Sequence, residues 1–465
     1  MINKYLYIIR RQFDRFMANN VTSIQKIVIY YLGFTVFAFF LLKMPWFRNP
    51  GVHTSAFDDF FMAISTVSVT GLSTYNINEV FNHRGIVLLE ILFQIGGLGI
   101  MMFLTFFFIF SKKKISLSQR QLIMTDMNQP KLSGIVKLIR ISMSFLIKIQ
   151  LIFGAIFAVH FYLNKSHVTI SESIFFGLYQ SISAATNSGF DVTGASIIPY
   201  KNDIFFLVCT MFLIMVGGIG FPVIMEIRER VLYKRKARQI PFRFSLFAKI
   251  AIFTFITLFI AGTIMIYLLE RQHLFANMNE GQKWLNAMFY SVTTRNAGLQ
   301  MHDLNEFQPA TLLLFSVLMF IGCSPSSVGG GVRTTTVAIL FLYMMSFIKS
   351  EENVNIFGRR ISAEDVKKAV VVFNLSLTMC FLAIMLLSAT ESHSLLAIIV
   401  EVTSAFGTTG LSLGITDDLT LFGKIVIGIL MFVGRVGMLY TLMMFLPKEK
   451  QDKAFLYPTE KIIIG

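Results

Sequence analysis

Four short segments of the chain end in a glycine that follows small or polar residues. Aligned on that glycine, they comprise Val69, Thr70 and Gly71; Asn187, Ser188 and Gly189; Asn296, Ala297 and Gly298; and Thr408, Thr409 and Gly410. Glycine adopts backbone conformations that other residues resist, so it lets a strand turn its carbonyl oxygens to one side. Carbonyl oxygens can replace the water oxygens around a cation. Together the segments predict a ring of carbonyls that binds a dehydrated cation.

The four glycines recur at intervals of 118, 109 and 112 residues. Self-similarity at a nearly fixed period indicates a repeated architecture. Each glycine follows an apolar stretch of about 10–14 residues, which is too short to cross a bilayer and fits a re-entrant helix. Irregular backbone at membrane depth must be buried in protein or line a water-filled cavity. One such glycine would be an ordinary turn, but four in register predict a central pore with fourfold pseudosymmetry.

The composition is that of a membrane protein. Hydrophobic residues make up 55% of the 465 residues and charged residues 14%, whereas soluble domains have about 45–50% and about 25%. Long apolar stretches cover residues 27–45, 85–110, 141–163, 204–227, 246–269, 310–348, 369–390 and 421–446. We therefore expect an all-α polytopic membrane protein, built from four helix–pore-loop–helix repeats around a central pore.

The apolar stretches and the glycine segments divide the chain into repeats. We expect a cytoplasmic N-terminal helix at 1–26, repeats at 27–111, 138–228, 244–348 and 365–447, and a cytoplasmic tail at 448–465. The segments on the side of the two termini carry thirty Lys and Arg, and the opposite segments carry nine. The positive-inside rule then places both termini in the cytoplasm. This distribution explains the net charge of +15 without a nucleic-acid partner.

A cluster of small residues recurs in the long helix that follows each glycine segment. The clusters are Gly96-Gly97-Leu98-Gly99, Gly217-Gly218-Ile219-Gly220, Gly322-Cys323-Ser324-Pro325 and Gly434-Arg435-Val436-Gly437. Small residues commonly let membrane helices pack closely. Flexibility of a pore-lining helix is the alternative, and the sequence leaves both open.

In the third repeat this helix is interrupted outright, and the sequence predicts such a break only there. The interruption comprises Gly322, Cys323, Ser324, Pro325, Ser326, Ser327, Val328, Gly329, Gly330 and Gly331. Proline and glycine disrupt helical hydrogen bonds, and lipid cannot satisfy the freed groups. The loop is therefore expected to face the pore. A buried arginine is costly unless it is paired, so we expect Arg435 to donate hydrogen bonds to the carbonyls of this loop and hold a gate closed. A simple kink remains the alternative, and Arg333 could be a snorkelling charge.

The four segments, which read VTGLS, TNSGF, RNAGL and TTGLS, resemble the Trk/Ktr/HKT potassium-transporter superfamily over essentially the whole chain. Eight spans without an extra N-terminal pair are most similar to its KtrB-type membrane subunit. The resemblance implies a gated K⁺ pathway, with residues 322–331 as the intramembrane gating loop. A serine in the first segment is associated with Na⁺ permeation in this family, so Gly71 implies a preference for K⁺.

The resemblance also implies the partners. A KtrB-type subunit forms a homodimer in the bacterial cell membrane and binds a cytosolic KtrA-type (RCK) nucleotide-binding ring. The transported ion would be K⁺, with Na⁺ as an activator left open, and no covalent cofactor is expected. Nucleotide would act only through the partner, because the chain has no GxxxxGK[ST] or GxGxxG motif. An alternating-access transporter is the alternative function, and an enzyme is not expected.

Overall fold

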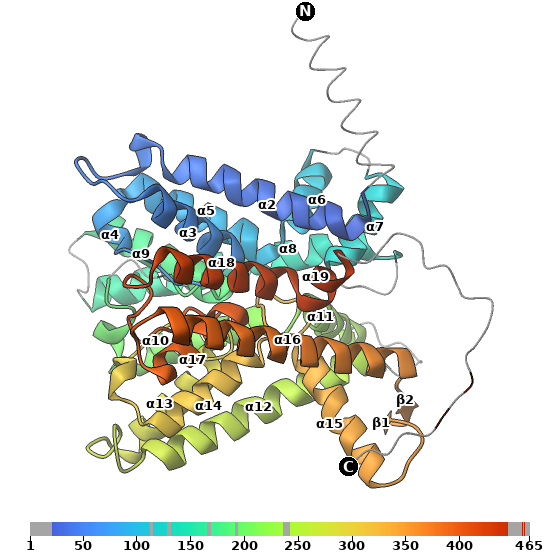
Figure 1. The fold of residues 1–465 in the computed structure, drawn as a ribbon. Coiled ribbons are helices and arrows are strands. Elements are labelled where there is room, and N and C mark those ends of the chain that lie inside the picture. Colours follow the sequence, from blue (N-terminus) through green and yellow to red (C-terminus); the bar gives the residue numbers. More distant parts are fainter. Residues whose placement is uncertain are drawn as a thin grey trace, which may run out of the picture.

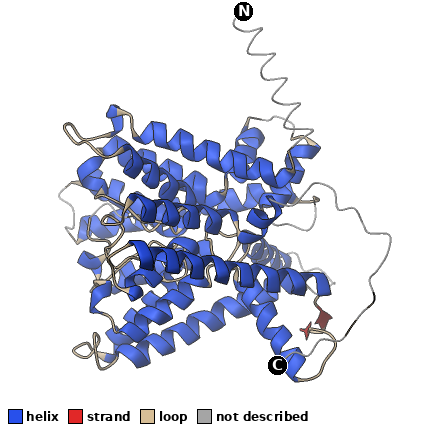
Figure 2. Ribbon diagram, in the orientation of Figure 1, coloured by secondary structure: helices blue, strands red, loops and turns tan. Residues whose placement is uncertain are grey.

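The computed structural model describes residues 21–111, 115–127, 132–164, 169–190, 194–235 and 242–444, together with Pro458 and Glu460. This part of the chain is mostly helical (Figure 2), and its only strands are the two-residue pair β1 (Asn355–Ile356) and β2 (Arg359–Arg360). The long helices run side by side across the molecule, with α2 on one flank and α12 on the other (Figure 1). The expected all-α class is confirmed.

Eight helical units account for the eight apolar stretches. Four single helices are long and apolar enough to cross a bilayer: α2 (Ser23–Leu42), α8 (Ile135–Leu163), α12 (Leu246–Glu270) and α16 (Ala363–Thr390). Three pairs reach that length together: α5 (His83–Leu98) with α6 (Ile100–Phe110), α10 (Ile204–Gly218) with α11 (Phe221–Arg235), and α18 (Leu421–Val436) with α19 (Met438–Met444). The last unit is α14 (Pro309–Phe320) with α15 (Thr334–Ile348), joined by residues 321–333. The chain is a multi-pass membrane protein.

A short helix lies between the first and second long helix of every repeat. These pore helices are α3 (Ala56–Ser68), α9 (Ile170–Thr186), α13 (Glu280–Thr293) and α17 (Leu395–Gly407). Three begin after a Ser or Thr whose side chain caps the helix, namely Ser55, Thr169 and Ser394, and α13 begins after Asn279, whose backbone N–H donates to Gln282 Oε1 at 3.3 Å. Such a side chain satisfies backbone N–H groups that the first turn leaves free. The caps explain where these short helices start.

The four repeats close into a ring. Within each repeat the first long helix packs on its own pore helix, in the pairs α2–α3, α8–α9, α12–α13 and α16–α17. The second long helix contacts the pore helix of the next repeat, in the pairs α5–α9, α10–α13, α14–α17 and α18–α3. The pair α18–α3 joins the fourth repeat back to the first. Fourfold pseudosymmetry is therefore a property of the packing as well as of the sequence.

The expectation that only the third repeat has an interrupted second helix is wrong. The pairs α5–α6, α10–α11 and α18–α19 bend by 98°, 103° and 100°. The bends lie at Gly99, Gly220 and Gly437, whose φ angles are +87°, +98° and +98°. These angles favour glycine because a Cβ would clash with the backbone. The third repeat differs in having a thirteen-residue loop, 321–333, where the others have a single bend.

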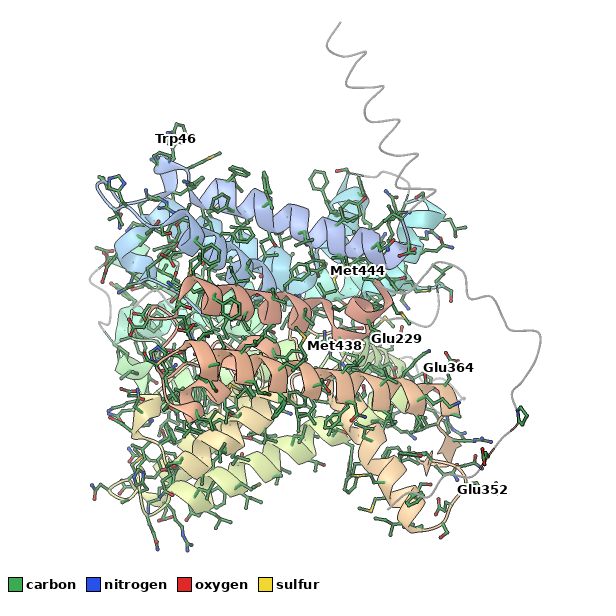
Figure 3. The ribbon with its side chains drawn as sticks, in the orientation of Figure 1. Trp46, Glu229, Glu352, Glu364, Met438 and Met444 are labelled. Atoms are coloured by element: carbon green, nitrogen blue, oxygen red, sulfur yellow. The ribbon has the colours of Figure 1, made fainter. Side chains whose placement is uncertain are left out.

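The remaining elements lie at the two ends of the bundle. The short helices η1 (Pro45–Phe47), α4 (Ile77–Val80), η2 (Ile198–Tyr200) and η3 (Leu304–Glu306) flank the pore helices, and α7 (Leu117–Asp126) links the first two repeats. In Figure 3, Trp46 lies at one end of the molecule, and Glu229 and Glu352 lie toward the other. The predicted N-terminal helix and C-terminal tail lie largely outside the described residues.

Candidate functional site

The four glycine segments leave the ends of their pore helices through a left-handed residue two positions before the glycine. The φ angles are +59° at Val69, +53° at Asn187, +92° at Asn296 and +50° at Thr408. In three repeats the backbone N–H of the next residue donates a hydrogen bond to a carbonyl oxygen in the last turn of the pore helix. These bonds, 2.8–3.0 Å long, run from Thr70 to Ser65 O, from Ser188 to Ser183 O and from Thr409 to Ser404 O. In the third repeat the N–H of Ala297 donates to Thr293 O at 2.9 Å. The same local turn thus occurs in three repeats, and the third repeat closes with a shorter turn.

The four glycines meet at the centre of the molecule. All have positive φ: +91° at Gly71, +71° at Gly189, +68° at Gly298 and +93° at Gly410. A Cβ placed on each would lie within 3.0 Å of the carbonyl oxygen before the next glycine, in the order Ser188, Ala297, Thr409 and Thr70. The last of these contacts returns to the first segment. The backbones therefore form a closed ring in which a side chain at any glycine would strike a carbonyl.

Side-chain hydroxyl groups form hydrogen bonds within or next to each glycine segment. Ser68 Oγ and Thr70 Oγ1 lie 2.6 Å apart, and Ser183 Oγ lies 2.9 Å from Ser188 Oγ. In the third repeat Thr293 Oγ1 donates to Leu299 O at 2.8 Å, and in the fourth Gly410 N donates to Ser404 Oγ at 3.0 Å. These bonds orient each segment, because buried polar groups that are satisfied keep one geometry.

A cavity of about 480 Å³ opens on the side of the ring away from the bent helices. The four glycines form its floor, and Asp303 and Asp417 are among its polar lining residues. Close by, burial and the charge of Lys201 lower the pKa of His302 to about 4. No group of three or more His, Cys, Asp or Glu that could hold a metal occurs among the described residues. The four glycines contribute only backbone atoms to the floor of this cavity.

The loop 322–331 lies against the opposite side of the ring. It is anchored on the α10–α11 bend, where Ser324 N and Val328 N donate to Gly218 O and Gly217 O at 3.1 and 3.3 Å. In return, Phe221 N donates to Ser326 O at 2.9 Å. A Cβ at Gly329 would lie 2.6 Å from the Asn296 amide carbon. The loop therefore reaches from the second repeat across to the third glycine segment.

Arg435 contacts this loop, as the sequence predicted. Its side chain is buried, and its guanidinium donates to Val328 O and Gly96 O, and to Gly97 O at 2.8 Å. Arg333 donates to the neighbouring carbonyl of Gly329, so it is held against the loop rather than snorkelling. The two guanidinium groups thus bind two successive carbonyls of the loop. Whether this contact gates the protein stays a prediction.

Close packing explains the first glycine of three small-residue clusters. A Cβ on Gly96, Gly217 or Gly434 would strike the carbonyl of Val67, Ala185 or Phe406, respectively, at the end of the pore helix of the same repeat. The last glycine of each of these clusters makes the bend described above. Close packing therefore accounts for the first glycine and a bend for the last, and flexibility of the pore-lining helix stays a prediction.

Sequence reasoning missed Arg295, which charge counting assigned to the outer segments. Its side chain is 2% exposed and its guanidinium carbon lies 3.9 Å from the centre of the Phe255 ring. Nη1 donates to Phe255 O at 3.1 Å, and Cys323 Sγ donates to Arg295 O at 3.0 Å. The only signal in the sequence was its position between the pore helix and Asn296.

Comparisons with known proteins agree with this architecture. The family model described as TrkH, a cation transport protein, matches residues 25–457. The chain is 41% identical to the Ktr system potassium uptake protein D of Bacillus subtilis, over 95% of this chain and 97% of that protein. It is 35% identical to the potassium/sodium uptake protein NtpJ of Enterococcus hirae, over 96% and 98%.

A solved structure shows the same fold. The potassium transporter TrkH from Vibrio parahaemolyticus superimposes with a TM-score of 0.73, covering 92% of this chain and 86% of that one at 17% identity. A match at 17% identity shows that the two chains share a fold and nothing further. The family match and the two relatives, taken with the ring of four repeats, show that this chain belongs to the TrkH family of cation transport proteins.

Proposed function

We propose that this protein takes up K⁺ through a gated, K⁺-selective pore, and that the four glycine segments are its selectivity filter. The observation that carries the proposal is the closed ring in which every glycine faces the carbonyl of the next segment. Carbonyl rings conduct K⁺ because they replace its hydration shell at low charge density. The relatives named for potassium uptake support K⁺ as the cargo.

The loop 322–331 and Arg435 are proposed as the gate. The loop lies on the far side of the ring from the open cavity, and the buried guanidinium holds it there. An ion leaving the filter would meet both. Conduction then requires the loop to move, and Arg435 favours the closed arrangement because hydrogen bonds to a charged donor are strong.

The proposed setting is the cell membrane, with both termini in the cytoplasm. The excess of Lys and Arg on the side of the termini supports that orientation. The word "system" in the name of the Bacillus relative supports a multi-subunit assembly. For this chain we propose a homodimer regulated by a cytosolic nucleotide-binding ring of the KtrA type. Dependence on Na⁺ is supported by the name of the Enterococcus relative.

The test is growth of a K⁺-uptake-deficient bacterium at limiting K⁺, with this chain expressed alone or with its ring partner. Rescue is expected, and failure under both conditions would overturn the proposal. Uptake of ⁸⁶Rb⁺ into proteoliposomes under an imposed voltage separates the two mechanisms. A pore gives flux without a coupled ion, whereas alternating access requires a fixed stoichiometry.

A further inference from the structure

One side chain connects the loop to two of the glycine segments. Asn296 is fully buried, two positions before Gly298. Its Oδ1 accepts a hydrogen bond from Gly330 N at 2.8 Å and another from Thr408 Oγ1 at 3.1 Å. Thr408 holds the corresponding position before Gly410. A single amide oxygen thus ties the third segment, the fourth segment and the loop together.

The other two segments have no such tie. The corresponding residue of the first segment is Val69, whose side chain cannot form a hydrogen bond. In the second segment it is Asn187, and neither amide atom of this residue has a hydrogen-bond partner within the described chain. The connection is therefore specific to the boundary between the third and fourth repeats. It does not follow from the pseudosymmetry.

The geometry leaves little freedom around this tie. A Cβ on Gly330 would lie 2.5 Å from Thr408 Oγ1, and one on Gly329 would lie 2.6 Å from Asn296 Oδ1. On the other side, Arg435 and Arg333 bind the carbonyls of Val328 and Gly329. Residues 328–330 are thus held between two guanidinium groups and the Asn296 amide. The loop cannot leave without breaking the bond from Gly330 to Asn296.

We propose that Asn296 couples the position of the loop to the ion selectivity of the filter. With the loop in place, its amide is fixed and orients the third and fourth segments. Once the loop leaves, Oδ1 retains only Thr408, and the backbone carbonyls next to Asn296 are free to shift. The bond from Gly330 to Asn296 thus links the loop to the filter and argues against independent control of flux and selectivity. Asn296 is a positioning residue here, and its role rests on the proposed function.

The test is the ratio of ⁸⁶Rb⁺ to ²²Na⁺ uptake by the full chain in liposomes. Asn296→Ser should lower this ratio by about fivefold, the factor that one neutral buried hydrogen bond supplies. Arg435→Ala removes one of the two guanidinium contacts of the loop and so favours its displacement, and it should lower the ratio in the same direction. The double variant should be no worse than either single variant, because both remove the same constraint. A second background, in which residues 329–331 are deleted, should give the same non-additivity.

Asn187→Ser is the matched control, since it changes the same position in a segment without the tie. Its effect on the ratio should multiply with that of Arg435→Ala. Thr408→Val removes the donor to Asn296 and should lower the ratio, whereas Thr408→Ser keeps the donor and should not. Independent, multiplying effects of Asn296→Ser in both loop backgrounds would overturn the coupling. Absence of ⁸⁶Rb⁺ uptake by the unaltered chain would instead count against the proposed function.

Discussion

Replacing Arg435 by alanine tests whether this side chain holds the loop closed. Its guanidinium binds three carbonyls, of which only Val328 O belongs to the loop. A hydrogen bond from a charged donor contributes about 1.5–3 kcal/mol, so its loss would shift a two-state gate by roughly 10–150-fold. Arg333 and Asn296 still hold Gly329 and Gly330 in the variant. We therefore expect the lower end, about a tenfold rise in basal flux.

The assay is ⁸⁶Rb⁺ uptake by proteoliposomes with matched amounts of protein and no partner subunit. Arg435→Lys keeps a positive charge, but its ammonium lacks the planar fork that reaches Val328 O and the carbonyls of α5 together. It should raise flux less than Arg435→Ala. Lys424→Ala is the control, because it removes a positive charge from the same helix, α18. Lys424 pairs with Asp58 at 2.9 Å and lies at the other end of this helix from Arg435.

A folded Arg435→Ala protein with unchanged or lower flux would show that Arg435 does not hold the loop closed. Folding is checked separately by a monodisperse elution profile and a melting temperature close to that of the unaltered protein. Equal flux increases in Arg435→Ala and Lys424→Ala would also refute it, because a general loss of charge would then explain the result. Shortening the loop within 322–331 should raise flux, as Arg435→Ala does.

Three further substitutions test the filter, an outer-face histidine and a buried carboxylate. Gly71→Ser should lower the Rb⁺/Na⁺ uptake ratio about tenfold, because φ is +91° and the added Cβ would lie 2.6 Å from Ser188 O; an unchanged ratio would exclude Gly71 from the filter. Protonation of His302 favours the unfolded chain, since its pKa is about 4 in the fold against 6.5 outside it. The free energy of unfolding should therefore decrease by at most roughly 3 kcal/mol as pH drops from about 6.5 toward 4, and the melting temperature should fall with it. His302→Asn should make the melting temperature less dependent on pH in this range. Glu270→Gln should lower the free energy of unfolding by about 1–3 kcal/mol, because the buried Glu270 side chain accepts hydrogen bonds from Gln308 N at 3.0 Å and from Thr311 Oγ1. A melting temperature equal to that of the unaltered protein would contradict this.

Much of the architecture is encoded locally and could be predicted. Apolar length identifies the spanning helices, because a bilayer of fixed thickness needs about twenty residues per helix. The four glycines could be aligned because each repeat needs a positive φ at the same point. Arg435 could be assigned to the loop because a guanidinium at membrane depth needs partners. Each of these inferences depends on one residue and its surrounding medium.

The bends were harder to predict. Gly99, Gly220 and Gly437 are plain in the sequence, but glycine accepts positive and negative φ almost equally. Its presence permits a bend of about 100° without requiring one. The burial of Arg295 could not be predicted for a similar reason, since the sequence does not show that the ring of Phe255, forty residues earlier, lies against its guanidinium.

The sequence by itself determined the membrane class, the four repeats and the residues that meet at the centre. Only the tertiary structure decided that α18 packs on α3 and closes the ring, and that Gly330 donates to Asn296. Both contacts join residues far apart in the chain, and both depend on how four similar but unequal repeats pack together. Local preference cannot specify such contacts, because the three segments with a polar residue two positions before the glycine look alike until the loop is placed against one of them.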